Sequence, residues 1–234
     1  MIASADGCPA GWVVAITEHW PALAPPHLAV CRDFATVLAV TAGCAVVVVD
    51  IPIGLPADGQ SRTCDERAKQ ELGAKASSVF YAPPRSLLTS TTHKDFSDRH
   101  RGQFNGDGIS IQAFGLVEKL RELEVVMTPA WQTRVREFHP ELVWQRLAGR
   151  PLPKKREREG REARWDLLRS LVAGREELTA WRKRAGSALK EDDLLDALVG
   201  LDLGHRLATN PARATCLPGN PPRDERGLRM EIWF

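Results

Sequence analysis

Residues 45–56 read AVVVVDIPIGLP, and they predict the central strand of the fold. Its unbroken run of apolar, mostly β-branched residues predicts a strand at 45–49 that is buried on both faces, as parallel strands are. The strand ends on Asp50, and Pro52 and Pro56 stiffen the segment that follows. A carboxylate is costly to bury unless it is paired, hydrogen-bonded or bound to a metal. Asp50 is therefore either a turn residue or a functional ligand.

Length and composition exclude several classes of protein. The chain has 234 residues, 43% of them apolar and 26% charged, which is typical of one globular domain over residues 1–234. The formal net charge of +2 does not by itself indicate nucleic acid. Five widely spaced cysteines without a C-x-x-C pair predict neither disulfides nor a zinc site, so we expect reduced thiols in the cytoplasm. Neither a signal peptide nor a membrane-spanning run is recognisable.

Apolar periodicity predicts an α/β fold with a mixed sheet, because strands come first and helices later. Strands are expected at residues 2–5, 12–17, 28–32, 45–49 and 134–138, with an alternating edge strand at 228–233 that could pair across a homodimer. Helices are expected at 34–40, from Thr63 to Gly73, at 109–123 and over most of 141–209. Apart from the helix after Thr63, residues 57–108 are expected to form an irregular, loop-rich insertion.

A second aspartate, Asp6, stands at the end of the first predicted strand, before the turn GCPAG. Aspartate followed by glycine is common in turns, and Asp50 allows the same interpretation. If the two strands are parallel neighbours, their carboxyl ends lie at one edge of the sheet, roughly 5 Å apart. Asp6 and Asp50 would then share one site.

The late helix at 190–201, KEDDLLDALVGL, brings a third group of carboxylates. At about 100° per residue, Asp192, Asp193 and Asp196 fall in one arc beside the apolar stripe. Acids near a helix start favour the macrodipole, which explains Asp192 and Asp193 but explains Asp196 less well. We therefore expect Asp192 to act on stability, and Asp193 and Asp196 to face the sheet edge.

Carboxylates gathered at one edge would repel one another and raise each other's pKa. A divalent cation resolves this repulsion, and oxygen-only ligands favour Mg²⁺ or Mn²⁺ over zinc. Two such ions activate water and stabilise the leaving oxygen when a phosphodiester is hydrolysed. The pattern therefore indicates Asp6, Asp50, Asp193 and Asp196 as candidate catalytic metal ligands.

Seven motifs occur together in an order that resembles a bacterial and archaeal family of unknown biochemical function, usually described as predicted nucleases of RNase H-like fold. They are DGCPAGW, VDIPIGLP, RTCDERAKQELG, SSVFYAPPR, EFHPEL, KKREREGREARWDLL and DDLLDAL, from Asp6 to the MEI at 230–232. The resemblance implies a five-stranded mixed sheet with parallel strands carrying Asp6 and Asp50. By analogy, these two residues and an acid of the late helix would bind the metal. The spacing of Asp193 and Asp196 also resembles Holliday-junction resolvases of this superfamily.

Other polar residues are candidates for the same site. Glu137, at the end of the fifth expected strand, is a further candidate metal ligand, and a strand-end salt bridge is the alternative. Serines and basic residues suit phosphate contacts, with turn capping as the alternative for the serines and a solvated helix as the alternative for the basic stretch at 146–164. The candidate substrate-binding residues, of which the last two match positions of the resembled family, are Arg62, Ser77, Ser78, Arg85, Lys155 and Arg164.

Two functions from different classes fit the sequence. The first is a nuclease that depends on Mg²⁺ or Mn²⁺, with DNA and RNA both open as substrate. The second is a non-catalytic module that binds nucleic acid or a phosphorylated ligand. Convergence of Asp6 and Asp50 with an acid of the late helix favours the nuclease. Acids paired internally with Arg62 or Arg85 favour the binding module.

Overall fold

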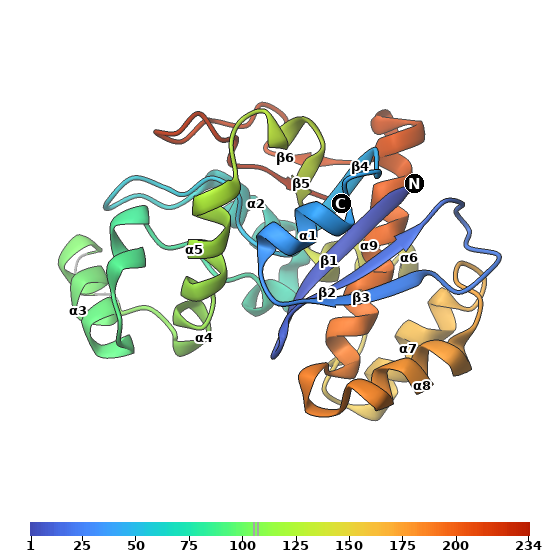
Figure 1. Cartoon of the computed structure of the whole chain (residues 1–234). Coiled ribbons are helices and arrows are strands. Elements are labelled where there is room, and N and C mark those ends of the chain that lie inside the picture. The colour runs from blue at the N-terminus through green and yellow to red at the C-terminus, as the bar shows by residue number, and fades with distance from the viewer. Residues whose placement is uncertain (105, 107) are drawn as a thin grey trace.

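The computed structural model describes residues 1–104, 106 and 108–234, and a five-stranded mixed sheet lies at its centre (Figure 1). The strand order is β3-β2-β1-β4-β5. β1 runs parallel to β4, and β4 parallel to β5, whereas β2 is antiparallel to both of its neighbours. The bounds are β1 Ile2–Cys8, β2 Gly11–Thr17, β3 His27–Cys31, β4 Val46–Val49 and β5 Val135–Glu137. The prediction of an α/β fold with a mixed sheet is confirmed.

Both faces of β4 are buried, as its valine run predicts. Val48 packs in the cluster that contains the apolar residues of α9 (Glu191–Thr209). Val47 and Val49 pack in the cluster on the opposite face, with α1 (Phe34–Val40) and α5 (Val117–Val126). Helices therefore cover the sheet on both sides, and Figure 1 shows α9 crossing behind β1 and β2. This arrangement leaves the carboxyl ends of β1 and β4 at the edge where chemistry is expected.

Small residues let α9 approach the sheet closely. A Cβ added to Gly200 would collide with Ser4 Oγ of β1 and lie 2.8 Å from Phe138 Cζ. One turn later, a Cβ on Gly204 would lie 3.7 Å from the carbonyl oxygen of Ala3, an ordinary contact. The helix therefore runs antiparallel to β1, and Asp196, one turn before Gly200, is directed to the end of β1 beyond Ser4.

The segment after β4 is more regular than expected. It contains α2 (Thr63–Leu72), as predicted, and also α3 (His93–Gln103), which was not. Thr92 caps α3 by accepting a hydrogen bond from the backbone N–H of Asp95, and Lys94 pairs with Asp98. Because α3 buries little besides Phe96, it lacks the apolar periodicity that signals a helix. Residues 105 and 107 of the expected insertion lie outside the described residues.

Two other element boundaries differ from expectation. The helix expected at 109–123 is divided into α4 (Ile111–Phe114) and α5, with Gly115 between them. The expected strand at 228–233 is reduced to β7 (Ile232–Trp233), which pairs with β6 (Cys216–Leu217) in a separate two-stranded sheet. The residues before β7 are held by both backbone and side-chain groups, since the backbone N–H of Met230 donates to the carbonyl oxygen of Pro222 and that of Arg229 to Gln132 Oε1.

The later part of the chain is helical, as predicted, but it is interrupted by loops. Its helices are α6 Pro140–Ala148, α7 Arg158–Leu168, α8 Arg175–Ala185 and α9. The loop between α6 and α7 returns to the sheet edge and carries Lys155. Among the described residues, none of the helices has the length and apolarity needed to cross a membrane.

The packing of α9 predicts the effect of one methyl group. Gly200→Ala should lower the free energy of unfolding by about 1–3 kcal/mol, because the core cannot admit the added atom without shifting. Gly204→Ala is the matched control, and it should keep or raise stability by roughly 0.5–1 kcal/mol through helix propensity. Urea unfolding measures both. Equal stabilities would contradict the close approach at Gly200.

Candidate functional site

Asp6 and Asp50 are neighbours at the sheet edge. Ala5 pairs with Val49 in the parallel register of β1 and β4, and the backbone N–H of Asp50 donates to the carbonyl oxygen of Ala5 at 3.1 Å. Both aspartates follow that last pair directly, so strand alternation turns both side chains to the face that α9 covers. β1 continues past Asp6 to Cys8 because it still pairs with β2 there, contrary to the expected end at residue 5.

Asp196 reaches the same edge from α9. Its side chain is 2% exposed, and both of its oxygens accept hydrogen bonds. Trp144 Nε1 of α6 donates to Oδ1 at 2.8 Å, and Lys155 Nζ donates to Oδ2 at 2.6 Å. The ammonium group of Lys155 thus supplies a positive charge to the acidic cluster formed by Asp6, Asp50 and Asp196.

Burial and mutual repulsion perturb the two strand-end aspartates. Burial, followed by the charges of Asp50 and Asp196, raises the pKa of Asp6 well above its usual value, and Lys155 opposes the rise. The pKa of Asp50 is raised to about 8, again mainly by burial and then by Asp196. Asp50 nevertheless keeps part of its surface open to solvent. A further cation at this edge would relieve the unfavourable charge.

Asp193 is held partly by the helix itself. One of its oxygens accepts the backbone N–H of Lys190 at 3.2 Å, a capping contact at the start of α9. Burial and Asp192 raise the pKa of Asp193 to about 6. The capping bond is made by Asp193, whereas the sequence led us to expect Asp192 in the stabilising role. Asp193 still lies close enough to Asp6 for their charges to interact.

Arg164 holds the loop that carries Lys155. The Arg164 side chain is fully buried, and it donates to the carbonyl oxygens of Pro153 and Gly160 and to Glu141 at 2.8 Å. Gly160 is needed here, because a Cβ would collide with the backbone of Lys154. The structure therefore places Arg164 behind Lys155 and away from solvent, not in the substrate contact predicted from the sequence.

Glu137 and Arg62 are bound to each other beneath the site. Both Nη atoms of Arg62 donate to the Glu137 carboxylate, at 2.7 and 2.8 Å, and Arg62 also pairs with Asp65. All three side chains are buried. Burial raises the pKa of Glu137 to about 7, and the charge of Arg62 opposes that rise. The strand-end salt bridge is thus the arrangement that the structure has, in place of a metal ligand and a substrate contact.

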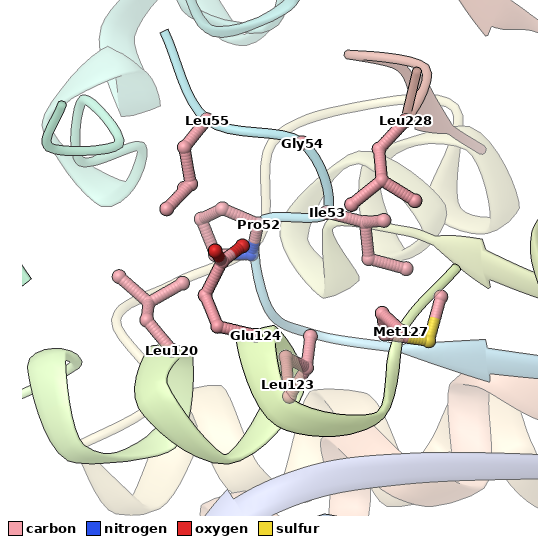
Figure 2. A pocket seen from close by; sticks show the side chains of 9 residues that line it. All are labelled: Pro52, Ile53, Gly54, Leu55, Leu120, Leu123, Glu124, Met127 and Leu228. Carbon is pink, nitrogen blue, oxygen red and sulfur yellow. The ribbon is translucent and has the colours of Figure 1, made fainter. Parts of the chain in front are cut away.

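The same ion pair clamps the segment that leaves Asp50. Glu137 accepts the backbone N–H of Ile53 at 2.6 Å, and Arg62 donates to the carbonyl oxygens of Ile53 and Gly54. Figure 2 shows the other side of this segment lying on the apolar side chains of α5, with Leu228 above. The crevice between them is too narrow for a water molecule. The stiff segment that the sequence predicts after Asp50 is therefore held in place on two sides.

Two of the three remaining candidates, Arg85 and Ser78, make structural contacts. Arg85 pairs with Glu124, Asp224 and Glu225. Ser78 Oγ donates to the carbonyl oxygen of Lys75 and so closes a turn, whereas Ser77 is exposed. Nothing in the sequence pattern signals the bond from Trp144 to Asp196, because a fully buried tryptophan is what a packed core already contains.

Two of the carboxylates at the sheet edge, Asp6 and Asp50, can bind a cation between them. Among the described residues, no three His, Cys, Asp or Glu side chains form a group ready to bind a metal ion. Within the same residues, Asp50 accepts no side-chain hydrogen bond, and Asp6 accepts one from its neighbour Gly7. Mg²⁺ is commonly held by one or two carboxylates plus waters and substrate phosphates. Asp6 and Asp50 therefore suit such an ion. Both oxygens of Asp196 already accept hydrogen bonds, from Trp144 and Lys155.

Comparison with known proteins gives one match. The family model described as "Protein of unknown function (DUF429)" matches residues 5–223. No curated protein and no solved structure matches the chain.

Asp50→Asn should change how stability depends on pH. The folded pKa of about 8 lies above the unfolded value of about 3.9, so the folded state binds more protons between these values. The contribution of Asp50 is therefore present at low pH and lost as pH rises through that window. In chelator, the free energy of unfolding of the wild type should fall more steeply than that of the variant, by up to about 1.4 kcal/mol per pH unit. Parallel curves would contradict the crowding of charge at Asp50.

Arg62→Met should lower the free energy of unfolding by about 3–5 kcal/mol, because it leaves buried acids without their cation. Adding Glu137→Gln should restore part of the loss. Arg169→Met is the control, since Arg169 forms an exposed pair with Asp166 at the same i, i+3 spacing as Arg62 and Asp65, and exposed pairs contribute about 0–1 kcal/mol. Similar losses for Arg62→Met and Arg169→Met in urea unfolding would show that the clamp is not important.

Proposed function

We propose that this chain, which belongs to the DUF429 family of proteins of unknown function, is a divalent-metal-dependent nuclease acting on phosphodiester bonds of nucleic acid. The observation that carries the proposal is the convergence of Asp6, Asp50 and Asp196 from two parallel strands and one helix. The five-stranded mixed sheet, with β1 and β4 as parallel neighbours, supports the RNase H-like assignment that the sequence resemblance implies.

The proposed roles follow from the contacts of each side chain. Asp6 and Asp50 hold Mg²⁺ or Mn²⁺, because their carboxylates retain free acceptor positions. A divalent cation, when bound, supplies Lewis-acid stabilisation of the phosphate and activation of water. Asp196, which also accepts the Trp144 indole, holds Lys155 beside these two acids. Lys155 suits a phosphate oxygen, since its ammonium is partly exposed at the same edge.

Rigid support is what such a site requires. A bound substrate must be held in a productive geometry, and ligands that are already fixed avoid an entropic cost on binding. The exit segment after Asp50 is fixed by Arg62 and Glu137, and the loop of Lys155 by Arg164. These three buried residues are therefore positioning residues in the proposal, rather than groups that touch the substrate.

A second candidate is a non-catalytic module that binds nucleic acid or a phosphorylated ligand. It is favoured by the complete hydrogen bonding of Asp196 and by the pairing of Glu137 with Arg62. In that case the acids hold Lys155 in place for a phosphate, and no metal is required. The two candidates differ in whether a divalent cation binds and whether the substrate is cleaved.

The test measures cleavage of end-labelled single-stranded and duplex DNA and RNA with Mg²⁺ or Mn²⁺. Asp50→Asn and Asp196→Asn should each reduce cleavage at least about a hundredfold while the protein stays folded. Asp202→Asn is the matched control, because Asp202 lies on the same helix and is also bonded to a tryptophan and a cation, Trp20 and Arg206. It should cleave like the wild type.

The non-catalytic candidate predicts a different set of results. The protein would then bind one of these nucleic acids equally well in chelator and in Mg²⁺, and would cleave none. Cleavage that survives Asp50→Asn would also contradict the nuclease proposal at this site.

A further inference from the structure

Lys155 occupies the position that a metal ion would use to reach Asp196. Its Nζ lies 2.6 Å from Oδ2 of Asp196, and its charge also acts on Asp6 and Asp50. The ammonium ion thus contacts Asp196, and its charge lowers the pKa of the other two carboxylates. The other oxygen of Asp196 accepts the Trp144 indole, so Oδ2 is the single atom that a departing Lys155 would make available.

The two partners of this ion pair differ in their freedom to move. The Lys155 side chain is 41% exposed, whereas the Asp196 side chain is 2% exposed and rooted in α9. Arg164 holds the backbone just before Lys155 through the carbonyl oxygen of Pro153, and Arg161 holds the backbone just after it through that of Arg156. If the ion pair breaks, the Lys155 side chain is therefore the part that moves. The loop of Lys155 and the Asp196 side chain stay in place.

We propose that Lys155 competes with the divalent cation for Asp196, and that it moves onto a phosphate of the substrate when nucleic acid binds. Its departure would free Asp196 Oδ2 at the same sheet edge as Asp6 and Asp50. Cation and phosphodiester would then bind cooperatively, each favouring the state in which Lys155 has left Asp196. This inference rests on the proposed function, because it takes the acidic cluster as the metal site.

The physical basis is competition between two cations for one buried oxygen. Asp196 is surrounded by little water, so its interaction with either cation is strong. An ammonium ion satisfies one carboxylate well, whereas a divalent ion satisfies several at once. A phosphate oxygen offers Lys155 an equivalent partner in more accessible surroundings, which lowers the cost of its move.

Calorimetric titration with Mn²⁺ tests the competition without measuring activity. Lys155→Met should bind Mn²⁺ at least about tenfold more tightly than the wild type, because the competing charge is gone. Lys155→Arg keeps that charge and should stay close to the wild type. Lys154→Met is the matched control, because Lys154 is 81% exposed and its nearest acid, Glu157, lies 4.0 Å away. It should not change Mn²⁺ affinity.

The outcomes separate this inference from the proposed function. If the wild type and Lys155→Met bind Mn²⁺ equally well, the metal site stands and the competition is refuted. If neither protein binds Mn²⁺, both the metal site and the competition are refuted. Tighter binding by Lys155→Met, with no change in Lys154→Met, supports both.

Amine labelling of the wild-type protein provides a test that does not depend on a variant that folds. An ammonium ion held by a carboxylate reacts slowly with an N-hydroxysuccinimide ester, and a released lysine reacts faster. Saturating Mn²⁺ should increase labelling of Lys155, measured by mass spectrometry, and should leave Lys154 unchanged. Equal labelling of Lys155 with and without Mn²⁺ would overturn the proposal.

Discussion

The close approach of α9 to β1 is the constraint on which the rest of the structure depends. Gly200 lies where a side chain would collide with Ser4, so the helix can follow the strand in van der Waals contact. This contact brings Asp196 to the point where β1 passes the end of β4. Without it, the strand-end aspartates would face solvent and the helix would carry an acid with no partner. Packing of small residues thus assembles the charged cluster.

The cluster is unfavourable by itself, and its surroundings explain how the fold tolerates it. Burial and mutual repulsion raise the pKa of Asp6 and Asp50, and one lysine provides the nearest opposite charge. Arg164 fixes the loop of that lysine, and the pair of Arg62 with Glu137 fixes the segment after Asp50. So much rigid support around an electrostatically costly group is characteristic of functional sites. A purely structural cluster would be replaced by apolar residues without loss of stability.

Much of this arrangement could be predicted from the sequence. The valine run predicted β4, and the rule that parallel strands end at one sheet edge placed Asp6 beside Asp50. Helical periodicity directed Asp196 to that edge. The strand and the helix arc are local patterns that periodicity reports, whereas the parallel pairing of the two strands is what the family resemblance implied.

Other features depend on contacts between distant residues, which periodicity does not report. Glu137 and Arg62 each looked available to a ligand, yet they are 75 residues apart in the chain and bind each other. Trp144 packs in the core, and its indole also donates to Asp196 across 52 residues of the chain. The helix α3 escaped prediction because it buries too little apolar surface to show a pattern. For Glu137, Arg62 and Trp144 the deciding partner lies outside the local sequence window, whereas α3 has local contacts but no apolar pattern.

The most direct test of this account is a crystal structure of the protein grown with Mn²⁺, analysed by anomalous scattering. We expect an anomalous peak at the sheet edge, about 2.1 Å from a carboxylate oxygen of Asp6 and one of Asp50. Lys155 should then have moved away from Asp196 Oδ2. Absence of a peak at this edge under saturating Mn²⁺, with Lys155 still bound to Asp196, would contradict the assignment of the cluster as a metal site.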